Sequence, residues 1–328
     1  MRFGFVMSTL LLATLSHAQT TEPAAAPSET PAESIGRIQE RNMVDLGYLL
    51  PQGRLALNAY ANVYTEAYEI KQNSTPDSKV ASIGNRVGIE LSYGIFDSLN
   101  IAAGVSYVPM RKTEEQITDL SAESRGWEEP TVGLQYRVLT QSESAPFDIV
   151  LGLNYSPKTE DLKYATFTSD GTPARGGDKT SFDLGFYRRT STGELALVLN
   201  HVSLGKTEGK SASGLTEITG KATGTTSVMG TGQFPFNDKV FVRGGLGATH
   251  NQETETTSAT VSSIESYGTL DFLAGMRIVV IPDRAMVDLA ISAQAPVKTD
   301  IEVNEGGTIK EMTSAARANF LAGVKFLY

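Results

Sequence analysis

From Gly53 to the C-terminus, apolar and polar residues alternate in runs of about ten. In one run, Val87, Ile89, Leu91 and Tyr93 are separated by polar or small residues. Similar runs cover residues 99–107, 132–138, 147–155 and 270–278. A period of two is typical of β-strands that have one apolar and one polar face. The pattern therefore predicts an all-β protein.

The connections between these runs are alternately short and long. The short ones are spaced 46 to 48 residues apart and centre near Asp97, Glu143, Ser191, Asn237 and Asp283. The long ones are hydrophilic and cover Lys71–Lys79, Arg111–Gly126, Pro157–Asp178, Gly205–Ala222, Asn251–Ser263 and Lys298–Glu311. The regular spacing predicts six hairpins, or about twelve antiparallel strands. Both ends of this region would then lie on the side of the short turns.

Alternation alone does not decide which face of the strands is buried. In a soluble sandwich or barrel the apolar face points inward, whereas in a membrane barrel it points to lipid and the polar face lines the lumen. The alternation of long and short connections favours the membrane barrel. So does the strand length, because about 9–11 tilted residues cross the hydrocarbon layer. We expect an up-and-down transmembrane β-barrel with short periplasmic turns and long extracellular loops.

Aromatic residues gather at the short-turn ends of the apolar rows. Rings of this kind prefer membrane interfaces, so they predict a girdle at the periplasmic interface. The girdle residues would be Tyr93, Tyr136, Phe147, Phe186, Phe234, Phe326 and Tyr328.

The polar rows predict the residues that line the lumen. The first strand would contribute Asn58, Tyr60, Asn62, Tyr64 and Glu66. Later strands would contribute Arg86, Glu90, Arg137, Asp148, Asp183, Arg243, Asp271, Asp288 and Arg317, with Lys325 on the last strand. The nearly balanced signs predict weak ion selectivity. Two interpretations stay open, since these residues could line a path for solutes or could brace the barrel by packing and pairing.

The N-terminal part differs in composition from the predicted barrel. Residues 1–18 have a basic start, an apolar run and a small-residue site, which predict a signal peptide. Residues 19–52 would form a periplasmic linker with a short helix or a plug, and residues 53–328 would form the barrel. The chain has no cysteine. Its formal charge of −9, without basic clusters, argues against nucleic-acid binding.

The last residues, "ARANFLAGVKFLY", keep a period of two up to Tyr328. Such a strand can close the sheet against the first strand, which removes an edge that would be costly in lipid. The ending also resembles the C-terminal signature of bacterial outer-membrane proteins. That resemblance implies recognition by the barrel-assembly machinery.

Three further stretches carry a resemblance to a family. "YGIFDSLNIAAGVSY", "EPTVGLQYRVL" and "FDIVLGLNYSPKTED" are similar to outer-membrane transporters of the phenol-degradation (MetA-pathway) type. The resemblance implies a barrel in the bacterial outer membrane, in contact with outer-membrane lipid, that passes small solutes. We therefore expect a porin-like channel, with a structural or adhesive barrel whose lumen is plugged as the alternative.

One motif raises the alternative of an enzyme. His201 and Ser203 lie two residues apart on the apolar face and resemble the motif of outer-membrane phospholipase A. On that resemblance His201 would be the general base and Ser203 the nucleophile. The family has Asn after the serine, whereas this chain has Leu204, so we expect no enzymatic activity. The lack of a His/Cys cluster predicts no metal site, and no motif indicates a cofactor.

Overall fold

The computed structural model describes residues 46–117, 120–142, 144–164, 171–173, 175–211, 217–258, 261–298, 301–314 and 317–328. Its strands belong to one continuous sheet. In the described ranges, no helix has both the length and the apolar character needed to cross a membrane. The predicted signal peptide and the first part of the predicted linker lie outside the described residues.

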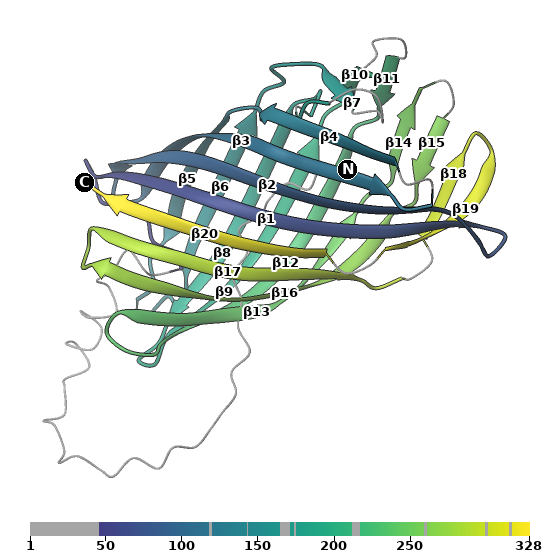
Figure 1. Cartoon of the computed structure of the whole chain (residues 1–328). Helices are drawn as coiled ribbons and strands as arrows, with labels where there is room; N and C mark the ends of the chain where they lie inside the picture. The colour runs from purple at the N-terminus through teal and green to yellow at the C-terminus, as the bar shows by residue number, and fades with distance from the viewer. Residues whose placement is uncertain are drawn as a thin grey trace, which may run out of the picture.

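Twelve strands form a closed antiparallel barrel, which confirms the predicted fold class (Figure 1). The ring consists of β1 (Leu55–Gln72), β2 (Thr75–Phe96), β3 (Leu99–Glu115), β5 (Thr131–Leu139), β6 (Asp148–Ser156), β8 (Lys179–Arg189), β9 (Glu194–Leu204), β12 (Thr223–Pro235), β13 (Val240–Asn251), β16 (Tyr267–Ile281), β17 (Ala285–Pro296) and β20 (Arg317–Leu327).

The last strand closes the ring against the first. β1 and β20 pair in antiparallel register from Ala56↔Leu327 to Thr65↔Ala318. The pairing reaches the last residue, since the Tyr328 N–H donates to the Leu55 carbonyl at 2.9 Å and Leu55 donates back at 3.2 Å. Closure leaves no sheet edge in the ring itself.

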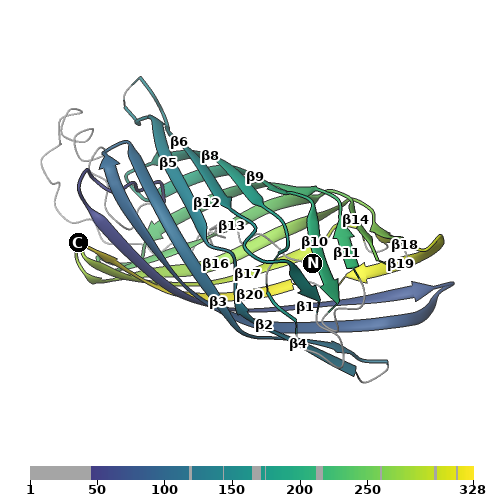
Figure 2. The same cartoon turned by 90° about the horizontal axis from the view of Figure 1, so that it is seen from above.

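Eight shorter strands extend the sheet beyond one end of the ring. They are β4 (Leu120–Trp127), β7 (Leu162–Tyr164), β10 (Thr207–Ser211), β11 (Glu217–Gly220), β14 (Thr254–Thr257), β15 (Val261–Ile264), β18 (Ile301–Glu305) and β19 (Thr308–Ser314). Figures 1 and 2 show β14, β15, β18 and β19 projecting at the end opposite the C-terminus. The long connections thus contain paired strands.

The prediction of a long connection over Lys71–Lys79 is wrong. β1 and β2 continue until only Asn73 and Ser74 are left between them, with φ angles of 51° and 63°. Two consecutive positive φ angles are typical of a tight type I′ hairpin turn. The apolar period is lost here because these strand ends are polar on both faces.

Side-chain exposure distinguishes the two faces of the barrel. Along β2, Val87, Ile89, Leu91 and Tyr93 are exposed on the outside, with Ile89 at 50 %. The intervening residues face the lumen. An exposed apolar belt on a closed barrel is the membrane arrangement. The short turns lie where the sequence predicts them, except that Glu143 lies outside the described residues.

Candidate functional site

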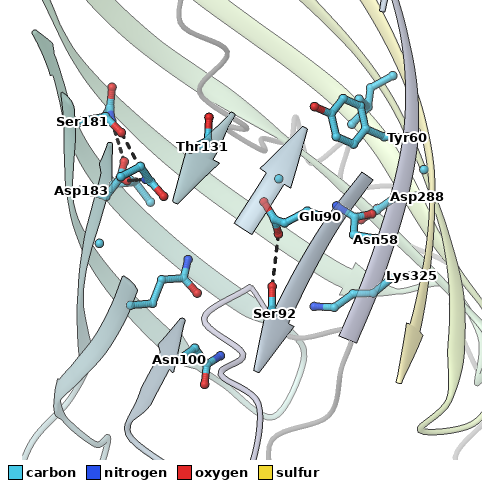
Figure 3. A pocket seen from close by; sticks show the side chains of 18 of the residues that line it. Asn58, Tyr60, Glu90, Ser92, Asn100, Thr131, Ser181, Asp183, Asp288 and Lys325 are labelled. Carbon is cyan, nitrogen blue, oxygen red and sulfur yellow. Dashed lines mark hydrogen bonds between the residues drawn. The ribbon is translucent and has the colours of Figure 1, made fainter. Parts of the chain in front are cut away.

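The lumen contains a cavity of about 530 Å³. It is lined by residues of β1, β2, β3, β5, β6, β8, β9, β12, β16, β17 and β20, together with Leu46, Tyr48 and Leu50 from the segment before β1. Figure 3 shows the labelled polar side chains converging on this space from several strands. The predicted lumen residues on its wall are Asn58, Tyr60, Arg86, Glu90, Asp183, Asp288 and Lys325.

Two tyrosines of β1 lie flat on glycines of the neighbouring strand. A Cβ placed on Gly88 would lie 2.4 Å from the Tyr60 ring, and one on Gly84 would lie 2.4 Å from the Tyr64 ring. Gly88 and Gly84 are the direct cross-strand partners of these tyrosines. Aromatic rings that cover strand glycines fix the local register. Here they also keep two large side chains against the wall and out of the lumen.

An acid, an amide and a base form one row across the neighbouring strands β2, β1 and β20 in the cavity wall. Asn58 of β1 pairs with Glu90 of β2 on one side and with Lys325 of β20 on the other. All three line the cavity. Ser92 donates a hydrogen bond to Glu90 at 3.4 Å, and Lys325 Nζ lies 5.6 Å from the centre of the Tyr48 ring. We call these three residues the Glu90–Asn58–Lys325 row.

A second charged group is tightly packed into the wall formed by β13, β16 and β17. Arg243 is 1 % exposed, and its Nη2 atom lies 2.9 Å from Asp288 Oδ1. Arg277 Nε donates to both Asp288 oxygens at 3.2 Å. One carboxylate is therefore shared by two arginines. We call these three residues the Asp288 brace.

Most of the other predicted lumen residues have polar or charged partners. Asp183 accepts hydrogen bonds from Asn200 at 2.6 Å and from Asn154 at 3.4 Å. Asp271 accepts from Thr249, Thr269 and Gln294 at 2.5, 3.1 and 2.8 Å. The ion pairs are Arg317–Glu66 at 3.6 Å and Arg137–Asp148 at 3.8 Å, and Asn62 is buried.

The extracellular side of the cavity has charged residues that the sequence analysis did not predict, among them Glu128, Glu129 and Arg175. Arg86 Nε lies 2.7 Å from Glu128 Oε2, and Ser106 donates to the same oxygen at 2.6 Å. Arg175 Nε lies 3.0 Å from Glu129 Oε2. Both acids lie between β4 and β5, just before Pro130. A proline that interrupts a strand pattern, next to two acids, is the signal that could have indicated them.

Residues 46–52, which we call the floor segment, lie at the periplasmic side of the cavity, where Leu46, Tyr48 and Leu50 form part of its lining. The Leu46 N–H donates to Glu194 at 2.7 Å, and Arg137 donates to the Gly47 carbonyl at 3.1 Å. Leu50 is 2 % exposed and packs in a cluster with Ala56, Met286 and Leu327. The described residues 46–50 contain no helix, and the rest of the segment for which a short helix or a plug is predicted lies outside the described residues.

Asn100 and Gly94 adapt the barrel to the floor segment. In the amide orientation that satisfies both groups, Asn100 donates to the Leu50 carbonyl at 3.2 Å and accepts from its N–H at 2.8 Å. A Cβ on Gly94 would lie only 2.2 Å from the Pro51 carbonyl oxygen. The absence of a side chain at position 94 therefore allows the segment to lie directly on β2.

The aromatic residues predicted as a girdle lie at the strand ends near the short turns. Tyr93, Tyr136, Phe147, Phe326 and Tyr328 are exposed, while Phe186 and Phe234 are half-buried. Their contact with the membrane interface stays a prediction.

His201 and Ser203 lie on the exposed face of β9, outside the lumen. His201 Nδ1 is 2.9 Å from the hydroxyl of Thr226 on the neighbouring strand β12. The hydroxyl next to the imidazole is thus that of Thr226.

Ion pairs hold the extracellular strands together. Lys310 of β19 contacts Asp77 and Glu305 at 2.7 Å each. Its hydrogen bonds, the stronger contribution from Asp77 and the next from Glu305, raise the pKa of the ammonium group above its usual value. The Lys298 ammonium beside Glu265, helped by the Glu302 N–H, lowers the pKa of the Glu265 carboxyl.

Comparison with known proteins gives structural neighbours only. No family model matches the chain, and none of the curated proteins matches it. The COG4313 outer membrane channel from Pseudomonas putida F1 is 12% identical, with a TM-score of 0.54 over 87% of this chain and 100% of the other. The transport unit of the autotransporter AIDA-I from Escherichia coli is 14% identical, with a TM-score of 0.54 over 90% and 96% of the two chains. At such identities the likeness shows the fold, which is that of bacterial outer-membrane β-barrels, in agreement with the predicted localisation.

Proposed function

We propose that the protein is an outer-membrane channel through which small solutes diffuse. The observation that carries the proposal is the polar cavity of about 530 Å³ inside the barrel. The fold of the neighbouring channel from P. putida is compatible with this function. Small barrels can be filled by their own side chains, but here Tyr60 and Tyr64 lie against the wall and leave room for a solute.

Passage of solutes requires the floor segment to move or to leave a gap. Its contacts with Glu194, Arg137 and Asn100 favour a second candidate function, a structural barrel with a plugged lumen. The external strands of such a barrel would meet partners.

Conductance separates the two candidates. The mature protein and a variant lacking residues 19–50 are compared in planar lipid bilayers and in liposome-swelling assays. The channel proposal expects discrete conductance steps and solute uptake from the mature protein, with larger steps from the variant. Conductance that arises only after the deletion would support the plugged barrel instead.

We also infer that the protein acts by passage and not by hydrolysis. The placement of His201 beside Thr226 supports this, because a nucleophilic serine needs its base within hydrogen-bond reach. The test is fatty-acid release from phospholipid vesicles by the wild type and by Ser203→Ala. Release that is lost in the variant would establish a hydrolase.

We propose that the C-terminal strand is the segment that the assembly machinery recognises. The supporting observation is that Tyr328 continues the β1–β20 pairing through its backbone hydrogen bonds with Leu55 and is itself exposed. Replacing Tyr328 by Ser is expected to lower the amount of folded barrel in the outer membrane. Normal levels of folded protein would contradict this.

A further inference from the structure

The charged residues around the cavity fall into two groups by their partners. The first group is paired, as in Arg86–Glu128, Arg175–Glu129 and the Asp288 brace. The second group includes Glu90 and Lys325, whose side chains face the same cavity (Figure 3). Among the described residues, no oppositely charged side chain lies within 4.0 Å of the Glu90 carboxylate or of the Lys325 ammonium.

The spacing of Glu90 and Lys325 follows from the sheet. Asn58 lies between them in direct register, and neighbouring strands are about 4.8 Å apart. The two backbone positions are therefore separated by roughly 10 Å. A small solute group above Asn58 would lie between the backbone positions of the two charged residues.

Both charged side chains border the cavity and are at least partly exposed. Glu90 is exposed to the lumen, and Asn58 and Lys325 are half-exposed. The Tyr60 ring lies two residues further along the same face of β1, against Gly88. A solute above Asn58 would therefore meet a carboxylate on one side, an ammonium on the other and an aromatic face beside it.

We propose that the Glu90–Asn58–Lys325 row is a binding site for a zwitterionic solute of the amino-acid type. The ammonium of the solute donates to Glu90, its carboxylate accepts from Lys325, and the Asn58 amide bonds to either group. The Tyr60 ring contacts the apolar part of the solute. The proposal deepens the proposed function, because it names the class of solute that the channel would select.

Charge complementarity is the physical reason for the selection. A neutral solute offers no opposite charge to Glu90 or to Lys325, and a solute with one charge pairs with only one of them. Charge-assisted hydrogen bonds are about twice as strong as neutral ones. Loss of one such bond is expected to weaken binding about tenfold or more.

The test uses three probes of the same shape and the purified full-length mature protein in detergent. L-Phenylalanine carries both charges, 3-phenylpropionate lacks the ammonium, and phenethylamine lacks the carboxylate. Isothermal titration is expected to show that phenylalanine binds at least about tenfold more tightly than either analogue. Equal binding of the three probes, or no binding of phenylalanine, would overturn the proposal.

Two variants assign the two halves of the site. Glu90→Gln is expected to weaken binding of phenylalanine and phenethylamine but not of 3-phenylpropionate. Lys325→Gln is expected to weaken phenylalanine and 3-phenylpropionate but not phenethylamine. The control Asp183→Asn removes a different charge from the same cavity. If this control weakens phenylalanine as much as Glu90→Gln does, the effect is a general one of lumen charge and the row is not the site.

Binding and conductance can fail separately. Phenylalanine binding without any conductance would contradict the channel function but not the site. Conductance without preferential phenylalanine binding would contradict the site alone. Heat-modifiable migration in detergent gels checks that each variant has folded as a barrel.

Discussion

Two parts of the lumen wall contain the same kinds of charged residue but differ in how these are paired. On β13, β16 and β17, Asp288 is buried between Arg243 and Arg277. On β2, β1 and β20, Glu90 and Lys325 flank Asn58 and stay open to the cavity. The first arrangement can hold strands together, and the second can meet a solute. Accessibility and pairing, and not residue type, therefore separate a structural charge from a binding one.

The largest effect is expected from breaking the brace. Asp288→Asn leaves Arg243 and Arg277 buried without their shared carboxylate. Removal of one partner from a buried ion pair costs about 3–5 kcal/mol. Urea unfolding in lipid vesicles should show the free energy of unfolding lowered by about that amount. An unchanged urea midpoint would mean that the group does not brace the barrel.

The second largest effect is expected on conductance, from a variant that displaces the floor segment next to the Glu90–Asn58–Lys325 row. In Gly94→Ala, the new methyl group would lie 2.2 Å from the Pro51 carbonyl oxygen and 2.7 Å from that of Leu50. We expect displacement of the floor segment and a higher single-channel conductance. The matched control is Gly323→Ala, which also faces the lumen but meets its nearest atom at 3.5 Å. Equal conductance of the two variants would show that the floor does not limit passage.

Much of this arrangement follows from the sequence. The period of two predicts the strands, and it separates the residues of the outer face from those that face the lumen. The spacing of the short turns predicts the ring of twelve, because each hairpin must cross the same thickness of membrane. The alternation does not tell which inward charges pair, since Asp288 and Arg243 belong to different hairpins.

Other features depend on contacts that have no local pattern. Leu46 and Leu50 are apolar residues in a linker, and only the closed ring provides Glu194 and Asn100 as their partners. Arg175 lies in an expected loop, yet it bonds to Glu129 across 46 residues of sequence. Such long-range pairs are set by the ring as a whole, so a reading of single strands misses them.

A smaller effect on conductance is expected from moving Tyr64, one of the two tyrosines that lie against strand glycines. Gly84→Ala places a methyl group 2.4 Å from the Tyr64 ring, which would push the ring into the lumen and lower the conductance. The double variant Gly84→Ala/Tyr64→Ala is the control and should restore it. If the single variant conducts like the wild type, Tyr64 does not limit the width of the path.

The smallest effect on stability is expected from a substitution in the Glu90–Asn58–Lys325 row. Lys325→Gln removes a charge that has no ion-pair partner among the described residues, so the free energy of unfolding should change by less than about 1 kcal/mol. The measurement is the same urea unfolding in vesicles that is used for Asp288→Asn. A loss as large as that of the brace variant would mean that Lys325 is structural, and the contrast between the two walls would disappear.

The most direct test of the account asks which solvent contacts each face of the strands. The chain has no cysteine, so single cysteines at positions 89 and 90 can carry a spin label without background. In liposomes, the label in Ile89→Cys should collide with dissolved oxygen, and the label in Glu90→Cys with a water-soluble nickel chelate. The reverse accessibility would place the apolar row inside the barrel and contradict the account of a water-filled lumen surrounded by lipid.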